Sequence, residues 1–138
     1  KKHVTSIDKK YFKPITEGLH AVYTDGNGRG VQIPGIEICG KTGTAENGPK
    51  VNGKRIRADH SIFVAFAPKE NPKIAIAVFV EHGGFGATVA GPVASLMIEK
   101  YLKGSITRKD LETKVHSRNL KELYDKYDSE TTRYAIGN

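Results

Sequence analysis

Two neighbouring segments rich in β-branched and aromatic residues constrain the fold of this chain most. The first runs from Ser61 to Ala67 and the second from Lys73 to Glu81, and a connection with two prolines, residues 68–72, separates them. Such segments predict β-strands, and the short connection favours antiparallel pairing. In the second segment, isoleucine and valine alternate with alanine and phenylalanine, so both faces are apolar. A sheet of this kind must be covered on both faces, which predicts an α+β fold with helices flanking a partial antiparallel sheet of about three strands.

Other elements are predicted on either side of these strands. Asp8 is a candidate N-cap for a helix that runs to about residue 25, and Pro14 within it predicts a kink or a late start. Residues 36–45 predict the third strand, and residues 46–59 predict a polar hairpin with an Asn-Gly turn. A second helix follows the glycines near residue 85 and is stopped by Gly104. Helical spacing predicts these buried faces: Tyr11, Ile15, Leu19 and Val22 in the first helix, and Ala90, Val93, Ala94, Met97 and Tyr101 in the second.

Composition limits the remaining possibilities. The chain has 138 residues, 38% hydrophobic and 27% charged, which suits one domain or a piece of a larger one rather than a disordered chain. We divide it into residues 1–104, which hold the predicted sheet, and residues 105–138, which are polar and predict a surface helix capped by Thr107 and Asp110. The longest apolar run, residues 74–80, is too short to span a bilayer, and a single cysteine excludes an internal disulfide.

Basic residues gather in the N-terminal half. The net charge is +7, and residues 1–60 hold 11 basic and 6 acidic side chains. The excess surrounds a glycine-rich stretch, at Lys41, Lys50, Lys54, Arg55 and Arg57. Such a cluster attracts anions, among them nucleic acid, anionic lipid and carboxylate substrates, and a solvated surface is an equal alternative.

Residues 35–42 match the phosphate-binding pattern G-x-x-x-x-G-K-[ST] letter for letter. That pattern needs a strand before it and a helix after it, so that backbone N–H groups face the phosphates. Here Pro34 precedes the match, residues 36–39 alternate as in a strand, and Gly43 and Gly48 would break a following helix. A P-loop-like nucleotide-binding protein is therefore an alternative and not the preferred hypothesis.

The same residues predict a binding strand if they are extended. Lys41 supplies a fixed cation, and Thr42 and Thr44 supply hydroxyl donors on one side of the strand. Gly43 has no side chain, so an extended peptide can approach and pair with the backbone. This set suits a ligand that ends in a carboxylate and has a carbonyl nearby, although an ideal strand sends Lys41 to the opposite face.

The order of the motifs carries a family resemblance. After a helix and a glycine-rich loop come Gly-Lys-Thr-Gly-Thr-Ala at 40–45, a polar hairpin, Phe-Val-Ala-Phe-Ala-Pro at 63–68, and Glu-His-Gly-Gly at 81–84 before the last helix. Over about residues 8–104 the chain resembles the C-terminal part of the transpeptidase domain of class B penicillin-binding proteins, most of all the elongation type, penicillin-binding protein 2. The resemblance implies the serine β-lactamase/transpeptidase fold, whose sheet has five strands.

The resemblance also implies an activity. These proteins are membrane-anchored D,D-transpeptidases that cross-link peptidoglycan on the periplasmic side of the inner (cytoplasmic) membrane. A serine attacks the D-Ala-D-Ala bond of the stem peptide, β-lactam antibiotics acylate the same serine, and a membrane glycan polymerase is a partner. By this likeness Lys41 sets the electrostatics of the cleft, and Thr42 and Thr44 bind the carboxylate. The Thr44 N–H forms half of the oxyanion hole, Gly43 permits the close approach, and no metal, cofactor or nucleic acid is expected.

The nucleophile is the main departure from the family pattern. In the family an S-x-x-K serine and an S-x-N motif precede K-T-G on a helical lobe. Here Ser6-Ile7-Asp8-Lys9 and Ser117-Arg118-Asn119 match in letters, and we interpret both as accidental because the second follows K-T-G. We therefore expect a fragment of a longer protein that is inactive alone and self-associates, since missing strands leave an apolar surface and an open sheet edge. The rival hypotheses are the nucleotide-binding protein and a nonenzymatic basic binding module.

Several other reactive side chains have structural interpretations. His60 and His82 flank strands without metal-ligand spacing. Cys39 is expected to be a small buried residue, and Glu81 a solvated carboxylate at a strand end. His20 lies in the first helix without a visible partner.

Overall fold

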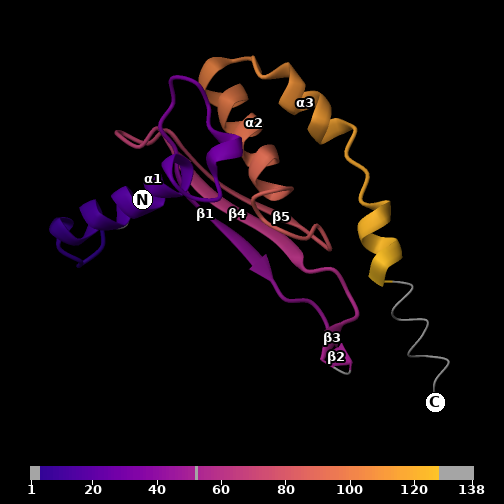
Figure 1. Cartoon of the computed structure of the whole chain (residues 1–138). Coiled ribbons are helices and arrows are strands. Elements are labelled where there is room, and N and C mark those ends of the chain that lie inside the picture. The colour runs from indigo at the N-terminus through magenta and orange to yellow at the C-terminus, as the bar shows by residue number, and fades with distance from the viewer. Residues whose placement is uncertain (1–3, 52, 128–138) are drawn as a thin grey trace.

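The computed structural model describes residues 4–51 and 53–127, which are built around a three-stranded antiparallel sheet (Figure 1). The strands are β1 (Cys39–Ala45), β4 (His60–Ala67) and β5 (Ile74–Val80), in the order β1-β4-β5. Opposite residues include Thr42 and Phe63 in the first pair and Phe63 and Val78 in the second. The predicted α+β class, antiparallel pairing and number of strands in the main sheet are thus confirmed.

The first helix begins later than its N-cap suggests. The Asp8 side chain accepts a hydrogen bond from the Lys10 N–H and starts a 3₁₀ turn, Lys9–Tyr11, and α1 (Phe12–Thr24) follows it. Pro14 lies in the first turn of α1, where its missing N–H costs nothing, so the late start is confirmed. The predicted buried face is wrong in the first half of the helix, because Tyr11 and Ile15 are 55% and 58% exposed. Only the second half of α1 packs closely, where Tyr23 is buried.

The second helix, α2 (Ala90–Lys103), covers one face of the sheet and ends at Gly104, whose φ of 76° is left-handed. Ala90, Ala94 and Ile98 are buried against this face, where the core also includes Phe63 of β4. The predicted stripe is partly wrong, because Met97 and Tyr101 are 52% and 64% exposed. The prediction missed the buried apolar residues Leu96 and Ile98 and two buried polar residues, Ser95 and Glu99.

The opposite face of the sheet is largely open within the described residues. Val64 of β4 and Phe79 of β5 are 45% and 56% exposed, and α1 reaches only one end of this face, where Leu19 borders a hollow of about 410 Å³. The expectation that both faces are covered is therefore wrong for the part of the chain that the structure describes. The exposed side chains of β4 and β5 on this face, Val64, Ala75, Ala77 and Phe79, are apolar, so this part of the face has the composition of an interior surface.

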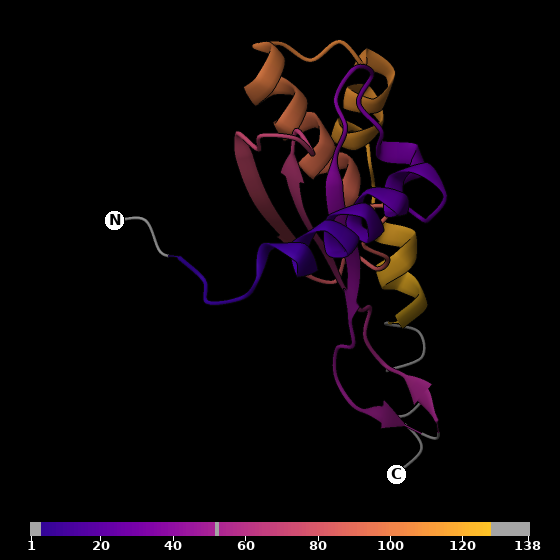
Figure 2. The same ribbon diagram turned by 90° about the vertical axis from the view of Figure 1, so that its left-hand side faces the viewer.

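The remaining elements extend from this centre. A small hairpin of β2 (Lys50–Val51) and β3 (Lys54–Arg55) projects beyond the end of the sheet, as predicted (Figures 1 and 2). A 3₁₀ turn, Arg29–Val31, precedes β1, and α3 (Lys109–His116) lies beside α2, followed by a helical stretch at 121–127. The predicted N-terminal cap of α3 is wrong, because the Thr107 hydroxyl donates its hydrogen bond to Glu99 and not to the start of α3. No helix among the described residues is long and apolar enough to cross a membrane.

Candidate functional site

The K-T-G residues lie in the middle of an extended strand. Lys41, Thr42 and Gly43 are central in β1, and each faces a residue of β4. The chain stays extended to Ala45 and then enters the hairpin, so no helix begins after Thr42. The P-loop alternative is therefore wrong, because its phosphate site needs a loop that opens a helix.

The strand divides its side chains between two faces. Thr42 and Thr44 lie on the face that α2 covers, with Phe63 and Ser61 as their β4 neighbours. Lys41 points to the open face, and its Nζ donates to the Thr42 carbonyl oxygen at 2.8 Å. The sequence predicted this division, and the hydrogen bond shows that the lysine ammonium bends back toward the strand edge.

The edge of β1 opposite β4 is unpaired within the described residues. Alternate residues of an edge strand direct their N–H and C=O groups away from the neighbouring strand. The Thr42 carbonyl receives the Lys41 ammonium, which indicates that the Thr42 peptide group faces this edge. Thr44 lies two residues further on, so its N–H faces the same edge. An extended ligand along β1 would meet a backbone donor, a backbone acceptor and an ammonium group.

A glycine-rich loop supports the strand from the α2 side. The Gly86 backbone lies so close that a Cβ there would overlap the carbonyl oxygens of Gly43 and Ile62. The Ser61 hydroxyl donates to the Phe85 carbonyl at 3.1 Å and accepts the Ala90 N–H at 3.0 Å. These bonds join the loop and the start of α2 to β4. This support was not predicted from the sequence, although Gly83, Gly84 and Gly86 stand just before the helix.

The start of β1 also packs closely, against β4 and against Tyr23 of α1. A Cβ at Gly40 would lie 2.5 Å from the Val64 carbonyl oxygen and 2.6 Å from the Tyr23 hydroxyl. Burial raises the pKa of Tyr23, and its hydroxyl has no hydrogen-bond partner among the described residues. Cys39 is fully buried, its Sγ donates weakly to the Thr16 carbonyl, and burial raises the pKa of the thiol. The cysteine is therefore structural, as predicted.

Two polar contacts connect α1 to the strand region. The Lys69 ammonium donates to Glu17 at 2.7 Å, and this hydrogen bond lowers the pKa of Glu17 and raises that of Lys69. His20 contacts the Ile38 carbonyl at 3.0 Å and the Glu37 carboxylate at 3.3 Å. The expectation that His20 has no partner is therefore wrong. The first contact joins α1 to the connection between β4 and β5, and the second joins α1 to the residues that lead into β1.

A second polar cluster lies where β1 ends. Arg55 contacts Glu46 and also Asp59, and the Arg55 hydrogen bond lowers the pKa of Glu46. The rings of His60 and His82 stack with centroids 5.1 Å apart, and the backbone N–H of His82 donates to His60 Nδ1. No group of side chains suited to a metal ion occurs among the described residues. These side chains hold the base of the basic hairpin, which explains why Arg55 is not freely solvated.

The serines with nucleophile-like spacing are not part of β1. Ser6 is exposed ahead of α1, and Ser117 is the C-cap of α3. The Asn119 side chain, which completes the second match, accepts from the Lys121 N–H in its own turn. Both serines thus have local positions that fit the accidental interpretation.

Comparison with known proteins gives the family. A model described as the penicillin binding protein transpeptidase domain matches residues 1–99. The chain belongs to this transpeptidase family. It is 42% identical over 90 residues, 57% of this chain and 13% of the relative, to the peptidoglycan D,D-transpeptidase MrdA of Acinetobacter baumannii. It is 30% identical over 131 residues, 91% of this chain and 19% of the relative, to the stage V sporulation protein D of Bacillus subtilis.

Solved structures agree with these relatives. Pseudomonas aeruginosa PBP2 in complex with WCK 5153 aligns with a TM-score of 0.59 and 31% identity, over 77% of this chain and 23% of that structure. The imipenem acyl-enzyme of penicillin-binding protein A from Mycobacterium tuberculosis aligns with a TM-score of 0.59 and 32% identity, over 72% and 21%. The resemblance to the transpeptidase fold and to penicillin-binding protein 2 is confirmed. The chain spans less than a quarter of each of these four relatives.

Proposed function

We propose that this chain supplies the K-T-G strand of a serine peptidoglycan D,D-transpeptidase that β-lactams acylate. The observation that carries the proposal is the edge of β1, unpaired among the described residues, where the Lys41 ammonium group lies at the Thr42 carbonyl and the Thr42 and Thr44 side chains flank it on the α2 side. Relatives with the same family domain are named peptidoglycan D,D-transpeptidases, and one is solved as a penicillin G acyl-enzyme. The substrates would be the D-Ala-D-Ala end of the peptidoglycan stem peptide and β-lactam antibiotics.

Each residue of the strand has a chemical task in this proposal. The Thr42 and Thr44 hydroxyls donate to the substrate carboxylate, and the Lys41 ammonium makes the cleft favourable for that anion. The Thr44 N–H donates to the carbonyl oxygen while it becomes an oxyanion, and one such donor contributes about 3–4 kcal/mol in related acyl-transfer sites. Gly43 leaves room for the ligand backbone beside the strand. The nucleophilic serine, its lysine and the second oxyanion donor come from a part of the protein outside this chain.

The rest of the proposal concerns the whole protein. A membrane anchor outside this chain would hold the transpeptidase domain on the periplasmic side of the inner membrane, where its peptidoglycan substrate lies. A membrane glycan polymerase would supply the strands that it cross-links. Neither a metal, a cofactor nor a nucleic acid enters this chemistry.

Acylation kinetics test the strand roles in the full-length protein. Labelling by a fluorescent penicillin should slow by about 100-fold or more when Thr42 and Thr44 are both changed to valine, because the hydroxyl donors are lost while the shape is kept. Tyr11→Phe, a change of an exposed tyrosine in the 3₁₀ turn before α1, is the matched control and should label normally. Equal labelling of the Thr42→Val/Thr44→Val protein and the wild type would refute the proposal.

The isolated chain gives two further tests. It should form no covalent adduct with the fluorescent penicillin, and stoichiometric labelling at Ser6 would contradict this. The edge of β5, which pairs with no further strand among the described residues, and the exposed side chains of Val64 and Phe79 support self-association of the isolated chain. Light scattering should therefore give a mass above that of the monomer, and a monomer at high concentration would be evidence against it.

A further inference from the structure

Two histidines lie where the β2–β3 hairpin meets the sheet. His60 begins β4 opposite Ala45, the last residue of β1, and His82 follows the end of β5. The two rings stack with centroids 5.1 Å apart, and the Phe79 ring lies at the same centroid distance from His60. The hairpin leaves the sheet at this point and projects beyond it (Figures 1 and 2). A change in the two histidine side chains therefore acts at the base of the hairpin.

The hydrogen bonds of the two rings require an unprotonated Nδ1 in each. The backbone N–H of His82 donates to His60 Nδ1 at 3.0 Å, so this nitrogen must hold a lone pair. The Asn47 Nδ2 lies 2.8 Å from His82 Nδ1 and 3.3 Å from the Ala58 carbonyl oxygen. A carbonyl oxygen only accepts, so the Asn47 atom that faces it is the amide nitrogen, and His82 Nδ1 accepts from the same nitrogen. Both imidazoles are therefore neutral in this arrangement.

The same bonds stabilise an uncommon backbone conformation. The φ of His82 is 53°, in the left-handed region that few residues other than glycine adopt and that surrounding contacts must hold. The bond to His60 holds its N–H, and the bond to Asn47 holds its ring. Close by, the Gly84 N–H donates to the Asp59 carbonyl at 2.8 Å. The turn after β5, residues 81–84, is thus tied to residues on both sides of the hairpin.

Acid acts on this arrangement because histidine is the side chain that changes its charge between pH 5 and 8. A proton on either Nδ1 occupies the lone pair on which the hydrogen bond depends. Two stacked imidazolium rings also repel each other. His82 is exposed, so protons from the solvent reach it. The bonds between the turn and the hairpin are made by the neutral rings alone, so acid favours an open arrangement.

The carboxylates nearest to this contact already have a cationic partner. Asp59 accepts the Asn47 N–H at 3.2 Å and contacts Arg55 at 3.3 Å. Arg55 also contacts Glu46. Neither carboxylate therefore needs a protonated histidine to neutralise its charge.

The other charged groups around His82 do not favour its protonation in the closed arrangement. Glu81 precedes it in the chain and is exposed, so water screens the attraction of this carboxylate for an imidazolium ring. His82 also lines a pocket of about 320 Å³. The ionisable side chains that share the pocket are Arg57, Tyr124 and Tyr127. Tyrosine is uncharged in this pH range, and the Arg57 guanidinium repels a second cation.

We propose that His60 and His82 form a pH-sensitive latch that holds the β2–β3 hairpin to the sheet at neutral pH and releases it in acid. In the closed latch both rings are neutral and both Nδ1 atoms accept a hydrogen bond. In acid each ring takes a proton from the solvent, both bonds break, and the hairpin base separates from the turn at 81–84. The K-T-G side chains take no part in these bonds, so the inference stands apart from the proposed transpeptidase chemistry.

Hydrogen exchange of the full-length protein at about pH 7.5 and about pH 5 tests this. Mass spectrometry should follow peptides that contain residues 82–84, because the His82 and Gly84 N–H groups bond across the latch. Their protection, corrected for the intrinsic effect of pH on exchange, should fall about tenfold or more in acid. Peptides from α2 should keep their protection, because the latch opens locally.

A variant that cannot gain these protons is the decisive comparison. In His60→Asn/His82→Asn the asparagine Oδ1 replaces each Nδ1 as an acceptor, and asparagine tolerates a positive φ. This double variant should keep its turn protected at both pH values. His116→Asn changes an exposed histidine of α3 and is the matched control, which should lose protection in acid as the wild type does.

A second variant removes the acceptor without relying on asparagine. His60→Phe keeps an aromatic ring but accepts no hydrogen bond, so its turn should exchange at neutral pH as fast as that of the wild type in acid. Normal protection in His60→Phe would overturn the proposal. It is also overturned if the wild type is equally protected at both pH values, if the double asparagine variant opens in acid as the wild type does, or if α2 loses protection together with the turn.

Discussion

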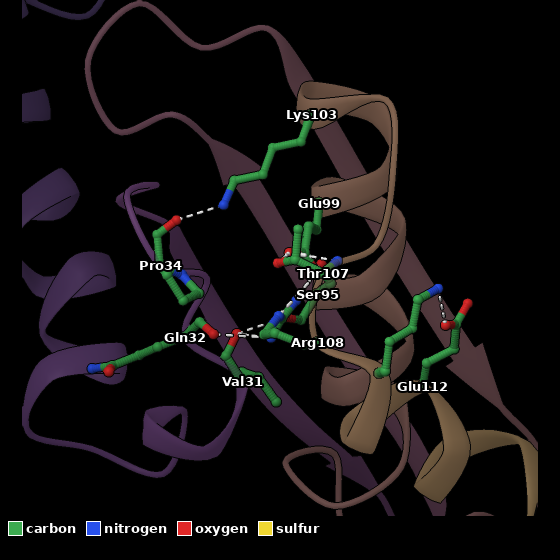
Figure 3. Close-up of polar contacts among 10 residues, drawn as sticks. Val31, Gln32, Pro34, Ser95, Glu99, Lys103, Thr107, Arg108 and Glu112 are labelled. Atoms are coloured by element: carbon green, nitrogen blue, oxygen red, sulfur yellow. Dashed lines mark hydrogen bonds and ion pairs between the residues drawn. The ribbon is translucent and has the colours of Figure 1, made fainter.

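Replacing Arg108 with methionine should destabilise the domain more than any surface change nearby. The guanidinium contacts Glu99 at 3.0 Å and the carbonyls of Ser95 and Gln32 at about 3 Å (Figure 3). Methionine fills a similar volume and donates no hydrogen bond, so the buried carboxylate keeps only the donors of Thr107. Removing one partner of a buried ion pair costs about 3–5 kcal/mol of unfolding free energy.

Urea unfolding of the chain, followed by circular dichroism at several protein concentrations, measures this loss. Lys109→Met is the matched control, because the Lys109–Glu112 pair is at the surface with Lys109 71% exposed, and its loss should cost less than about 1 kcal/mol. The reasoning is refuted if Arg108→Met costs no more than Lys109→Met.

The pH dependence gives an independent check of the same pair. Burial alone would raise the pKa of Glu99, yet the hydrogen bonds from Thr107 and Arg108 hold it below its ordinary value of 4.5. A carboxyl group whose pKa is lower in the folded than in the unfolded state stabilises the fold at pH values above its ordinary pKa. This contribution is lost as the pH falls through the folded pKa. The wild type should therefore lose more stability than Arg108→Met between pH 6 and strongly acidic pH. An equal loss in both proteins would show that the pair does not set the titration.

Three further predictions follow from close packing around β1. Cys39 should resist thiol reagents in the native chain and react after unfolding, since it is fully buried and burial raises the pKa of the thiol; rapid native labelling would contradict this. Gly40→Ala should destabilise the fold by about 1–3 kcal/mol, because the new Cβ overlaps β4. Gly18→Ala is the control: its Cβ meets open space in α1, so the substitution should stabilise the fold, and a higher midpoint of thermal unfolding for Gly40→Ala than for Gly18→Ala would contradict this packing. Ser61→Ala should cost about 1–3 kcal/mol, because it leaves the Ala90 N–H without its acceptor, and an unchanged unfolding midpoint would contradict this.

Local patterns predicted the strands well. The two apolar segments and the K-T-G segment became β4, β5 and β1 because alternation and β-branched content act over a few residues. The hairpin and the stop at Gly104 followed from turn chemistry in the same way. That Lys41 lies on the opposite face of the sheet from Thr42 and Thr44 also follows from the two-residue period of a strand.

The errors come from contacts between segments far apart in the chain. Helical spacing could not show which side of α2 meets the sheet, because Met97 and Tyr101 are as apolar as the residues that are buried. The burial of Glu99 depends on Arg108, which approaches it only after the turn at Gly104. Thr107 was expected to cap α3, and a buried carboxylate nearby is a stronger acceptor for its hydroxyl. The contacts of His20 with the residues just before β1 are likewise set by how α1 packs.

The position of a bound β-lactam shows whether β1 is the strand that binds the substrate. A crystal structure of the full-length protein acylated by penicillin should show the ligand carboxylate within about 3 Å of the Thr42 or Thr44 hydroxyl. The acyl carbonyl oxygen should accept the Thr44 N–H. A covalent adduct whose carboxylate and carbonyl both lie away from β1 would show that β1 is not the binding strand.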